Sequence, residues 1–375
     1  MNKKKLFVLT YVLFSGMTFL FVLEWTLIAF DNRGVDIWKR VLHLDTIQNE
    51  ENEEFGRIVE SAIFDSLLGW DQVGPGVLPN VKYIAQSFGD SFTRTTSGKS
   101  WQDQFLESTK LGILNFGIAG YGLDQAVLKS EKYLLKSSIS RDVKYNILGV
   151  YGKMYHRSLS YYLPNYWINT EEFRFCFKPV FIKENGKFKL KLPPCKSAEC
   201  LRNGFLNLDS DLYADLKQND YWYKIELAKP ELKFPRILSY IDAFPKIIEQ
   251  NKKRLYLEPY FFINDHSIEL TKYLITKFYK TSVKQNKVPI ILLMYGKFEL
   301  NGIIQNKRED NWLIESLNEN SVNYIDTAPI FIEQLESNYD INNFFEHDGH
   351  YNISGDSLVA LSIIQSFETL GEITK

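Results

Sequence analysis

The feature of this sequence that most constrains the fold is an alternation of apolar runs with helical patterns. Five short runs predict strands, at residues 81–88, 113–116, 144–152, 288–296 and 321–326. Helical patterns lie between or after them, at residues 100–108, 123–137, 266–285 and 353–370. Strands that are apolar along nearly their whole length are typical of a parallel sheet buried on both faces. The alternation therefore predicts an α/β domain with helices on both sides of a parallel sheet.

The alternation is interrupted between residues 155 and 262. Aromatic and charged residues mix there, and ENGK at residues 184–187 indicates a hairpin turn between two alternating strands. We interpret this stretch as an insert or cap on one α/β domain, whose halves then lie at residues 79–154 and 263–375. Its aromatic residues indicate core and lid packing by default, with an acyl or sugar pocket as the alternative. They are Tyr155, Tyr161, Tyr162, Tyr166, Trp167, Phe173, Phe175 and Phe177.

A long apolar run follows three lysines at the amino end. Residues 6–23 carry no charge, Glu24 interrupts the run, and residues 25–30 resume it. About 20 apolar residues span a bilayer, and lysines ahead of them favour a cytoplasmic amino end. Residues 1–30 therefore predict a transmembrane anchor, followed by a membrane-proximal linker and lead-in at residues 31–78. A cleaved signal peptide and a buried core helix are the alternatives. The first two interpretations both place the bulk of the protein outside the cytoplasm, in the periplasm or at the cell surface.

Charge and cysteine content exclude several classes of protein. Lys plus Arg number 44 and Asp plus Glu number 46, so the formal charge of -2 gives no field that would hold nucleic acid. The three cysteines lack the paired spacing of a zinc site and are too few for a disulfide scaffold. Cys195 and Cys200 are close enough in sequence to form a disulfide in an exported protein, or they are two unpaired thiols, while Cys176 has no evident partner.

Two glycine-containing segments follow predicted strands, where ligands of open α/β sheets bind. Gly89-Asp90-Ser91 comes after the first strand, so Ser91 is a candidate nucleophile; an ordinary turn or helix-capping serine is the alternative. The segment NFGIAGYG at residues 115–122 follows the second strand. Its glycines suit close backbone approach, and their N–H groups are candidate oxyanion donors, with a plain turn as the alternative.

A third segment, EHDGHYNISG at residues 346–355, precedes the last predicted helix. An acid close to a histidine can hold one ring nitrogen while the other faces a serine. Metal binding by His347, Asp348 and His350 is one alternative, and a histidine that caps the helix is another.

Together the three segments resemble the SGNH (GDSL-type) hydrolase superfamily, over about residues 65–370. LGW at residues 68–70 and FKP at residues 177–179 look like one membrane-anchored bacterial branch. The resemblance implies a flavodoxin-like three-layer α/β/α sandwich and a Ser-His-Asp triad that needs neither metal nor other cofactor. It assigns Ser91 as nucleophile, His350 as base with His347 as second choice, and Asp348 as the orienting acid. The N–H groups of Ser91 and Gly120 are then the oxyanion hole.

The sequence departs from the superfamily pattern in two places. Asp348 and His350 are two residues apart rather than three, which resembles the alginate O-acetyltransferase branch. In the superfamily pattern an Asn that donates to the oxyanion follows the third strand, but after residues 144–152 this chain reads KMYHR and has no Asn. Either Lys153 or a backbone N–H substitutes, or the transition state is held less tightly. One missing donor costs about 100- to 1,000-fold in rate. We expect a structural role for Asp90, and ordinary solvated or salt-bridged roles for Arg157 and Lys178.

These observations predict an exported, membrane-anchored serine esterase. Its substrates would be O-acyl, above all O-acetyl, esters of an envelope glycan or lipid. Two alternatives remain: an O-acyltransferase that modifies an extracytoplasmic polysaccharide, and a catalytically weak SGNH-fold protein that binds glycan.

Overall fold

The computed structural model describes residues 15–16, 18–23, 62–72, 74–95, 98–136, 142–161, 177–194, 211–220, 265–337 and 340–373. The chain divides into two compact units, of which one comprises residues 56–201, 219–221 and 259–375 and contains the sheet. Helix α8 (Asp211–Asn219) falls almost wholly in the other unit. Among the described residues, no helix combines the length and apolarity needed to cross a bilayer. Most of the predicted anchor, residues 1–30, lies outside them.

Five parallel strands form the central sheet. They are β3 (Lys82–Phe88), β4 (Leu111–Asn115), β5 (Tyr145–Tyr151), β8 (Val288–Met294) and β9 (Tyr324–Asp326). Their spatial order is β4-β3-β5-β8-β9, which is the flavodoxin-like order 2-1-3-4-5. After β3 the chain adds β4 on one side of it and then crosses to add β5 on the other side, so the order of strand addition reverses between β3 and β5. A ligand crevice is expected outside the carboxyl ends of those two strands.

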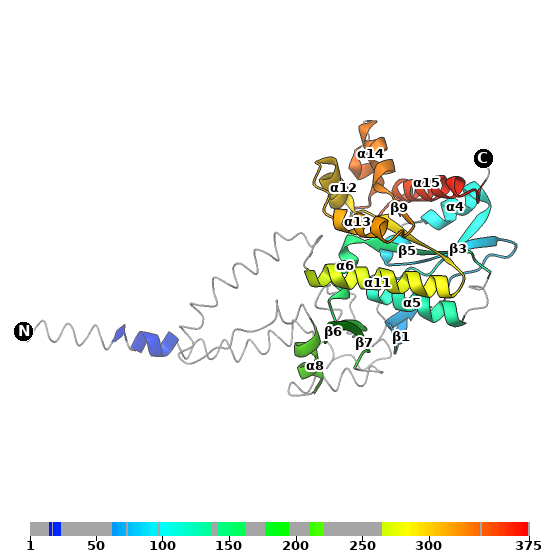
Figure 1. Ribbon diagram of the computed structural model, residues 1–375. Coiled ribbons are helices and arrows are strands. Elements are labelled where there is room, and N and C mark those ends of the chain that lie inside the picture. The colour runs from blue at the N-terminus through cyan, green and yellow to red at the C-terminus, as the bar shows by residue number, and fades with distance from the viewer. Residues whose placement is uncertain are drawn as a thin grey trace, which may run out of the picture. The chain divides into compact units, whose positions relative to one another are not determined.

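Helices cover both faces of the sheet (Figure 1). One face carries α4 (Trp101–Thr109) and α15 (Ile353–Thr369), which pack against each other, and the opposite face carries α5 (Leu123–Lys136) and α11 (Asp265–Lys284). Every residue of β5, and every residue of β8 after its first, is buried. The predicted three-layer arrangement around a parallel sheet is therefore confirmed. Its strands are covered on both faces, which explains why their sequences are apolar along nearly their whole length.

Two antiparallel hairpins stand apart from the sheet. The predicted ENGK hairpin is confirmed: β6 (Val180–Glu184) pairs with β7 (Lys187–Lys191), and Asn185 and Gly186 take φ angles of 49° and 75°. Such angles are those of a type I′ turn, which matches the twist of a hairpin. The second hairpin joins β1 (Ala62–Asp65) to β2 (Gly69–Gln72), where the sequence predicted only a turn-rich lead-in.

Several short helices were not predicted from the sequence. They are α3 (Ser91–Arg94), α6 (Gly152–Ser158), α12 (Lys297–Ile304), α13 (Asn311–Glu319), α14 (Ala328–Glu336) and the 3₁₀-helix at Ile341–Phe344. Each has nine residues or fewer, which is too short for a clear 3.6-residue period. Helix α6 continues directly from β5. It spans the predicted boundary between the first half of the domain and the insert, which lies between residues 154 and 155.

Candidate active site

The candidate nucleophile lies in a tight turn at the carboxyl end of β3. Ser91 is the first residue of α3 and is buried, with 4% of its surface exposed. Asp90 caps the helix, since its Oδ1 accepts the N–H of Phe92 at 3.0 Å. Only glycine fits at position 89, because a Cβ there would collide with the side chain of Thr93. The turn therefore presents Ser91 in one fixed orientation at the crevice edge of the sheet.

A histidine and an aspartate complete a line of three side chains. His350 Nε2 lies 2.8 Å from Ser91 Oγ, and His350 Nδ1 lies 2.9 Å from Asp348 Oδ2. Asp348 Oδ1 also accepts the backbone N–H of His350 at 3.0 Å, so one carboxylate orients both the ring and the loop. The structure thus brings together Ser91, His350 and Asp348, which are 259 and 2 residues apart in sequence. This is the arrangement in which an imidazole can take the hydroxyl proton while an acid holds its other nitrogen.

The remaining polar residues of this segment have other positions. His347 is exposed, whereas the ring of His350 packs against that of Phe92 with 5.4 Å between centroids. Asn352 caps α15 by accepting the N–H groups of Ser354 and Gly355. Among the described residues, no group of three or more His, Cys, Asp or Glu side chains is placed to hold a metal ion.

The environment of Asp348 keeps its carboxyl group ionised. Partial burial raises its pKa, but the hydrogen bonds from the backbone and ring of His350 outweigh that effect, and the pKa lies below its ordinary value of 3.8. A carboxylate that stays charged at neutral pH can stabilise the imidazolium that forms when His350 accepts a proton.

The glycine loop after β4 lies against the nucleophile turn. The Phe116 N–H donates to the Ser87 carbonyl at 2.8 Å and the Ile118 N–H to the Gly89 carbonyl at 3.1 Å. Gly120 takes a φ of 78°, a left-handed conformation that favours glycine. The loop therefore runs beside the turn that carries Ser91. An oxyanion hole formed by the N–H groups of Ser91 and Gly120 requires this proximity, and the donor roles of the two residues stay predictions.

Two segments distant in sequence brace this loop. The hydroxyl of Tyr121 donates to the Trp70 carbonyl at 2.6 Å, and Gln125 Nε2 donates to the Leu68 carbonyl at 2.8 Å. These carbonyls belong to the LGW segment, which packs directly on the FKP segment because Gly69 leaves room for the Phe177 carbonyl. The two segments that the sequence analysis linked to one bacterial branch thus meet behind the candidate oxyanion loop.

The FKP segment also carries a fully buried ion pair. Lys178 Nζ donates to Asp124 in the first turn of α5, directly after the glycine loop, and both side chains are inaccessible to solvent. Burial raises the pKa of Asp124 and lowers that of Lys178, and their mutual attraction opposes both shifts. The default interpretation of Lys178 as a salt-bridged residue is therefore correct, although the pair is in the core rather than at the surface.

Arg157 is likewise salt-bridged. Its Nη1 donates to Asp90 Oδ2 at 2.8 Å and to the Tyr121 carbonyl at 3.1 Å. Asp90 has the structural role that the sequence predicts, as helix cap and as partner of Arg157.

Other sequence-predicted features lie partly outside the described residues. The side chain of Lys153, the three cysteines, and the aromatic residues at 162, 166, 167, 173 and 175 are among these. Tyr155, Tyr161 and Phe177 are described and are buried, which fits the packing role. For these three the pocket interpretation is not needed.

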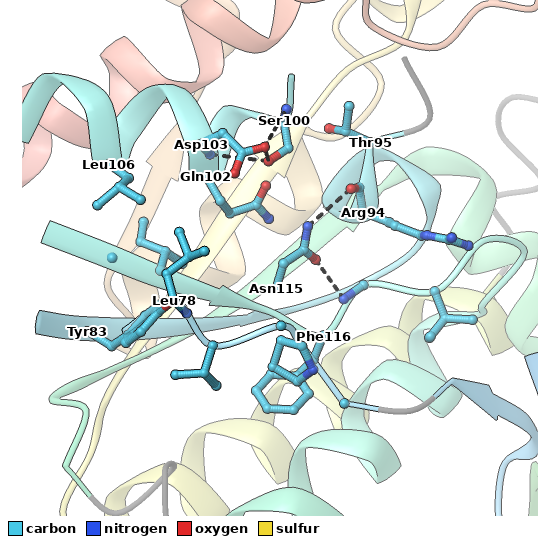
Figure 2. A pocket seen from close by; sticks show the side chains of 18 of the residues that line it. Leu78, Tyr83, Arg94, Thr95, Ser100, Gln102, Asp103, Leu106, Asn115 and Phe116 are labelled. Atoms are coloured by element: carbon cyan, nitrogen blue, oxygen red, sulfur yellow. Dashed lines mark hydrogen bonds between the residues drawn. The ribbon is translucent and has the colours of Figure 1, made fainter. Parts of the chain in front are cut away.

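A cavity of about 510 Å³ lies on the β4 side of the nucleophile turn. Arg94 and Thr95, just after Ser91 in sequence, line it together with Asn115 and the segment 74–78 (Figure 2). Asn115 joins two of its walls, since Nδ2 donates to the Arg94 carbonyl at 3.1 Å and Oδ1 accepts the Gly117 N–H at 3.0 Å (Figure 2). Sequence reasoning did not identify this cavity, because its walls come from separate parts of the chain.

No protein-family model matches the chain, and no curated protein matches it. Solved structures do. A member of the lipolytic protein G-D-S-L family from Veillonella parvula is 12% identical, with a TM-score of 0.36, over 76% of this chain and 98% of that one. A putative lipolytic protein of the G-D-S-L family from Desulfitobacterium hafniense is 10% identical, with a TM-score of 0.35, over 75% and 97%. An acetylxylan esterase from Geobacillus stearothermophilus, solved as a catalytic mutant, is 10% identical, with a TM-score of 0.37, over 78% and 94%.

Proposed function

We propose that this chain is a serine esterase of the SGNH type that hydrolyses O-acyl esters. The observation that carries the proposal is the line from Ser91 Oγ through the His350 ring to Asp348, with separations of 2.8 and 2.9 Å. The line lies at the carboxyl end of β3, where the strand order of the sheet opens a crevice. A buried serine hydroxyl within hydrogen-bond distance of an oriented imidazole is an activated nucleophile.

The reaction proceeds in two halves. His350 Nε2 takes the Ser91 proton as Oγ attacks the ester carbonyl, and the N–H groups of Ser91 and Gly120 stabilise the resulting oxyanion. His350 then gives the proton to the leaving alcohol, and an acyl-serine remains. A water molecule, deprotonated by His350, attacks the acyl carbonyl. The bond between the acyl carbon and Ser91 Oγ then breaks, His350 returns the proton to Oγ, and the carboxylic acid leaves. Asp348 holds the imidazole in the required tautomer throughout.

The proposed substrates are O-acetyl or other short O-acyl esters of an envelope glycan or lipid. This part of the proposal is supported by the apolar run at residues 6–23 behind three lysines, which favours export and attachment to the cytoplasmic membrane. The catalytic domain then works outside the cytoplasm, on the side where such esters occur.

An O-acyltransferase is the second candidate. The two-residue spacing of Asp348 and His350 favours it, because that spacing resembles the alginate O-acetyltransferase branch. In such an enzyme the acyl-serine would be released to a sugar hydroxyl instead of water. The two candidates share every step up to the acyl-enzyme and differ only in the acceptor.

The test is ester turnover by the full-length chain. We expect hydrolysis of p-nitrophenyl acetate or butyrate that falls at least about 1,000-fold in Ser91→Ala and His350→Ala. Ser354→Ala is the matched control, because Ser354 is exposed in the same segment as His350. His347→Ala tests the second-choice base, and we expect it to leave turnover unchanged, since His347 is exposed. Turnover that survives in Ser91→Ala would refute the proposal.

Adding an acetylated donor with an oligosaccharide acceptor separates the two candidates. An esterase releases acetate whether or not the oligosaccharide is present. A transferase gives Ser91-dependent acetylation of the oligosaccharide at the expense of acetate release.

A further inference from the structure

One nitrogen of Arg157 joins the two loops that carry the candidate oxyanion donors. Nη1 donates to Asp90 Oδ2 at 2.8 Å and to the Tyr121 carbonyl at 3.1 Å. Asp90 directly precedes Ser91 in sequence, and Tyr121 directly follows Gly120. The guanidinium group therefore bridges the immediate neighbours of both donor positions.

The bridge is part of a packed site rather than a surface contact. Asp90 is fully buried, and its other oxygen is engaged by the Phe92 N–H, while the side chain of Arg157 is 12% exposed. The end of α6 also packs closely on the end of the glycine loop: a Cβ at Gly122 would lie 3.0 Å from Ser158 N, and Ser158 Oγ accepts the N–H of the next residue, Leu123, at 2.8 Å. The two N–H groups of Nη1 lie in the plane of the guanidinium and so hold both acceptors at fixed angles, whereas the N–H groups of a lysine rotate and fix no angle.

We propose that Arg157 is a positioning residue that sets the separation between the N–H groups of Ser91 and Gly120. The proposal rests on the proposed function and deepens it. In the superfamily pattern an Asn after the third strand donates to the oxyanion itself. Arg157, six residues after Tyr151 at the end of β5, instead acts through the Asp90 carboxylate and the Tyr121 carbonyl.

The consequence concerns the transition state rather than substrate binding. Oxyanion donors act only when they lie about 2.7 to 3.1 Å from the developing charge. A shift of about 1 Å costs about 100-fold in rate. Because an oxyanion is absent from the ground state, loosening the bridge should lower kcat and leave KM nearly unchanged.

The experiment compares Arg157→Lys with Arg308→Lys in the full-length chain. Arg308 is a matched control: it is 20% exposed and pairs with Asp310 at 2.9 Å and Asp326 at 2.8 Å, in a cluster that contains none of the three candidate triad residues. Arg157→Lys keeps a cation beside Asp90 and so avoids a stranded buried charge. We expect kcat to fall about 100-fold in Arg157→Lys and to stay near wild type in Arg308→Lys.

Two further readouts separate positioning from a merely structural role. Phenylboronic acid, which forms a tetrahedral adduct on an activated serine, should bind Arg157→Lys more weakly by about the same factor as kcat falls. Guanidinium at low millimolar concentration should restore part of the kcat of Arg157→Ala. Unchanged kcat in Arg157→Lys overturns the proposal, and so does a loss of kcat without weaker boronate binding.

Labelling of Ser91 by a fluorophosphonate distinguishes failure of the Arg157 proposal from failure of the proposed function. If Ser91 is labelled equally fast in wild type and Arg157→Lys, the positioning proposal fails and the proposed function stands. If Ser91 is not labelled in wild type, the proposed function fails and the Arg157 proposal falls with it. Slower labelling in Arg157→Lys alone supports both.

Discussion

The two sides of the candidate active site are built in different ways. On the nucleophile side, Ser91 is 4% exposed and Asp90 is fully buried. On the acid–base side, the side chain of His350 is 27% exposed and that of Asp348 is 63% exposed. The first side owes its geometry to core packing and contacts distant in sequence. The second owes much of its geometry to one short turn, in which Asp348 holds a residue only two positions away.

Buried ion pairs gather on the nucleophile side. Lys178 pairs with Asp124, and Lys129 Nζ pairs with Asp71 Oδ1 at 2.7 Å, each from a segment far along the chain. Burial lowers the pKa of Lys129 to about 8 in spite of the attraction of Asp71. Removing one partner of such a pair strands a charge in a low-dielectric core. Breaking one of these buried pairs should therefore cost stability, whereas a change at the largely exposed Asp348 should mainly cost activity.

The largest effect on stability is expected for Lys178→Met. The change leaves Asp124 buried without its cation, so the free energy of unfolding should fall by about 3 to 5 kcal/mol in urea denaturation. Lys183→Met is the matched control, because Lys183 pairs with Glu269 at the surface and its loss should cost less than about 1 kcal/mol. The double variant Lys178→Met/Asp124→Asn should recover part of the loss. Equal stability of the two lysine variants would show that the buried Lys178–Asp124 pair is no more important for stability than a surface pair.

An intermediate effect on the free energy of unfolding is expected for Asp356→Asn. Asp356 links the nucleophile turn to α15. Its Oδ1 accepts the Thr95 hydroxyl at 3.0 Å, and its Oδ2 has no hydrogen-bond partner among the described residues. Burial raises the pKa of Asp356 from 3.8 to about 7, against the lowering effect of the bonds from Thr95 and the Trp101 backbone. Between about pH 4 and pH 7 the folded protein then keeps a proton that the unfolded chain has already released.

The contribution of Asp356 to the stability of the wild type should accordingly fall as pH rises through that window. The contribution of Asp356 is up to about 1.4 kcal/mol per pH unit, and it levels off above the folded-state pKa. Asp356→Asn has no carboxyl group to ionise, so its free energy of unfolding should decline less over the same range. Urea denaturation of both proteins at a series of pH values measures the difference. Parallel curves would show that Asp356 is ionised in the folded protein.

The smallest effect on stability is expected for Asp348→Ala. The side chain is largely exposed, so the free energy of unfolding should change by less than about 0.5 kcal/mol. Ester turnover should nevertheless fall about 100-fold, because the His350 ring loses the acceptor that fixes its tautomer. Calorimetry and ester kinetics on one preparation measure both quantities. A large loss of stability with normal turnover in Asp348→Ala would show that Asp348 is a structural residue and not the acid that orients His350.

Sequence reasoning found the parts of the site that depend on local pattern. Ser91 was located because it follows a strand, and Asp348 and His350 because they precede a helix and share a short segment. The five strands and the ENGK hairpin carried equally local signals. The buried pairing of Lys178 with Asp124, 54 residues away, has no local signal, because either residue alone resembles an ordinary surface charge.

The position of Arg157 shows the same limit. It lies on α6, a helix of seven residues, which is too short to show a period and extends into the stretch interpreted as an insert. Only the fold brings Arg157 to Asp90, 67 residues earlier in the chain, and to Tyr121, 36 residues earlier.

The assignment of Ser91 as the nucleophile that His350 activates is tested by the site at which a fluorophosphonate probe reacts with the full-length chain. Intact-mass and peptide analysis should place one phosphonyl group on Ser91 in the wild type and in Ser354→Ala, with no adduct in Ser91→Ala and much slower labelling in His350→Ala. A phosphonyl adduct that persists in Ser91→Ala would contradict the account.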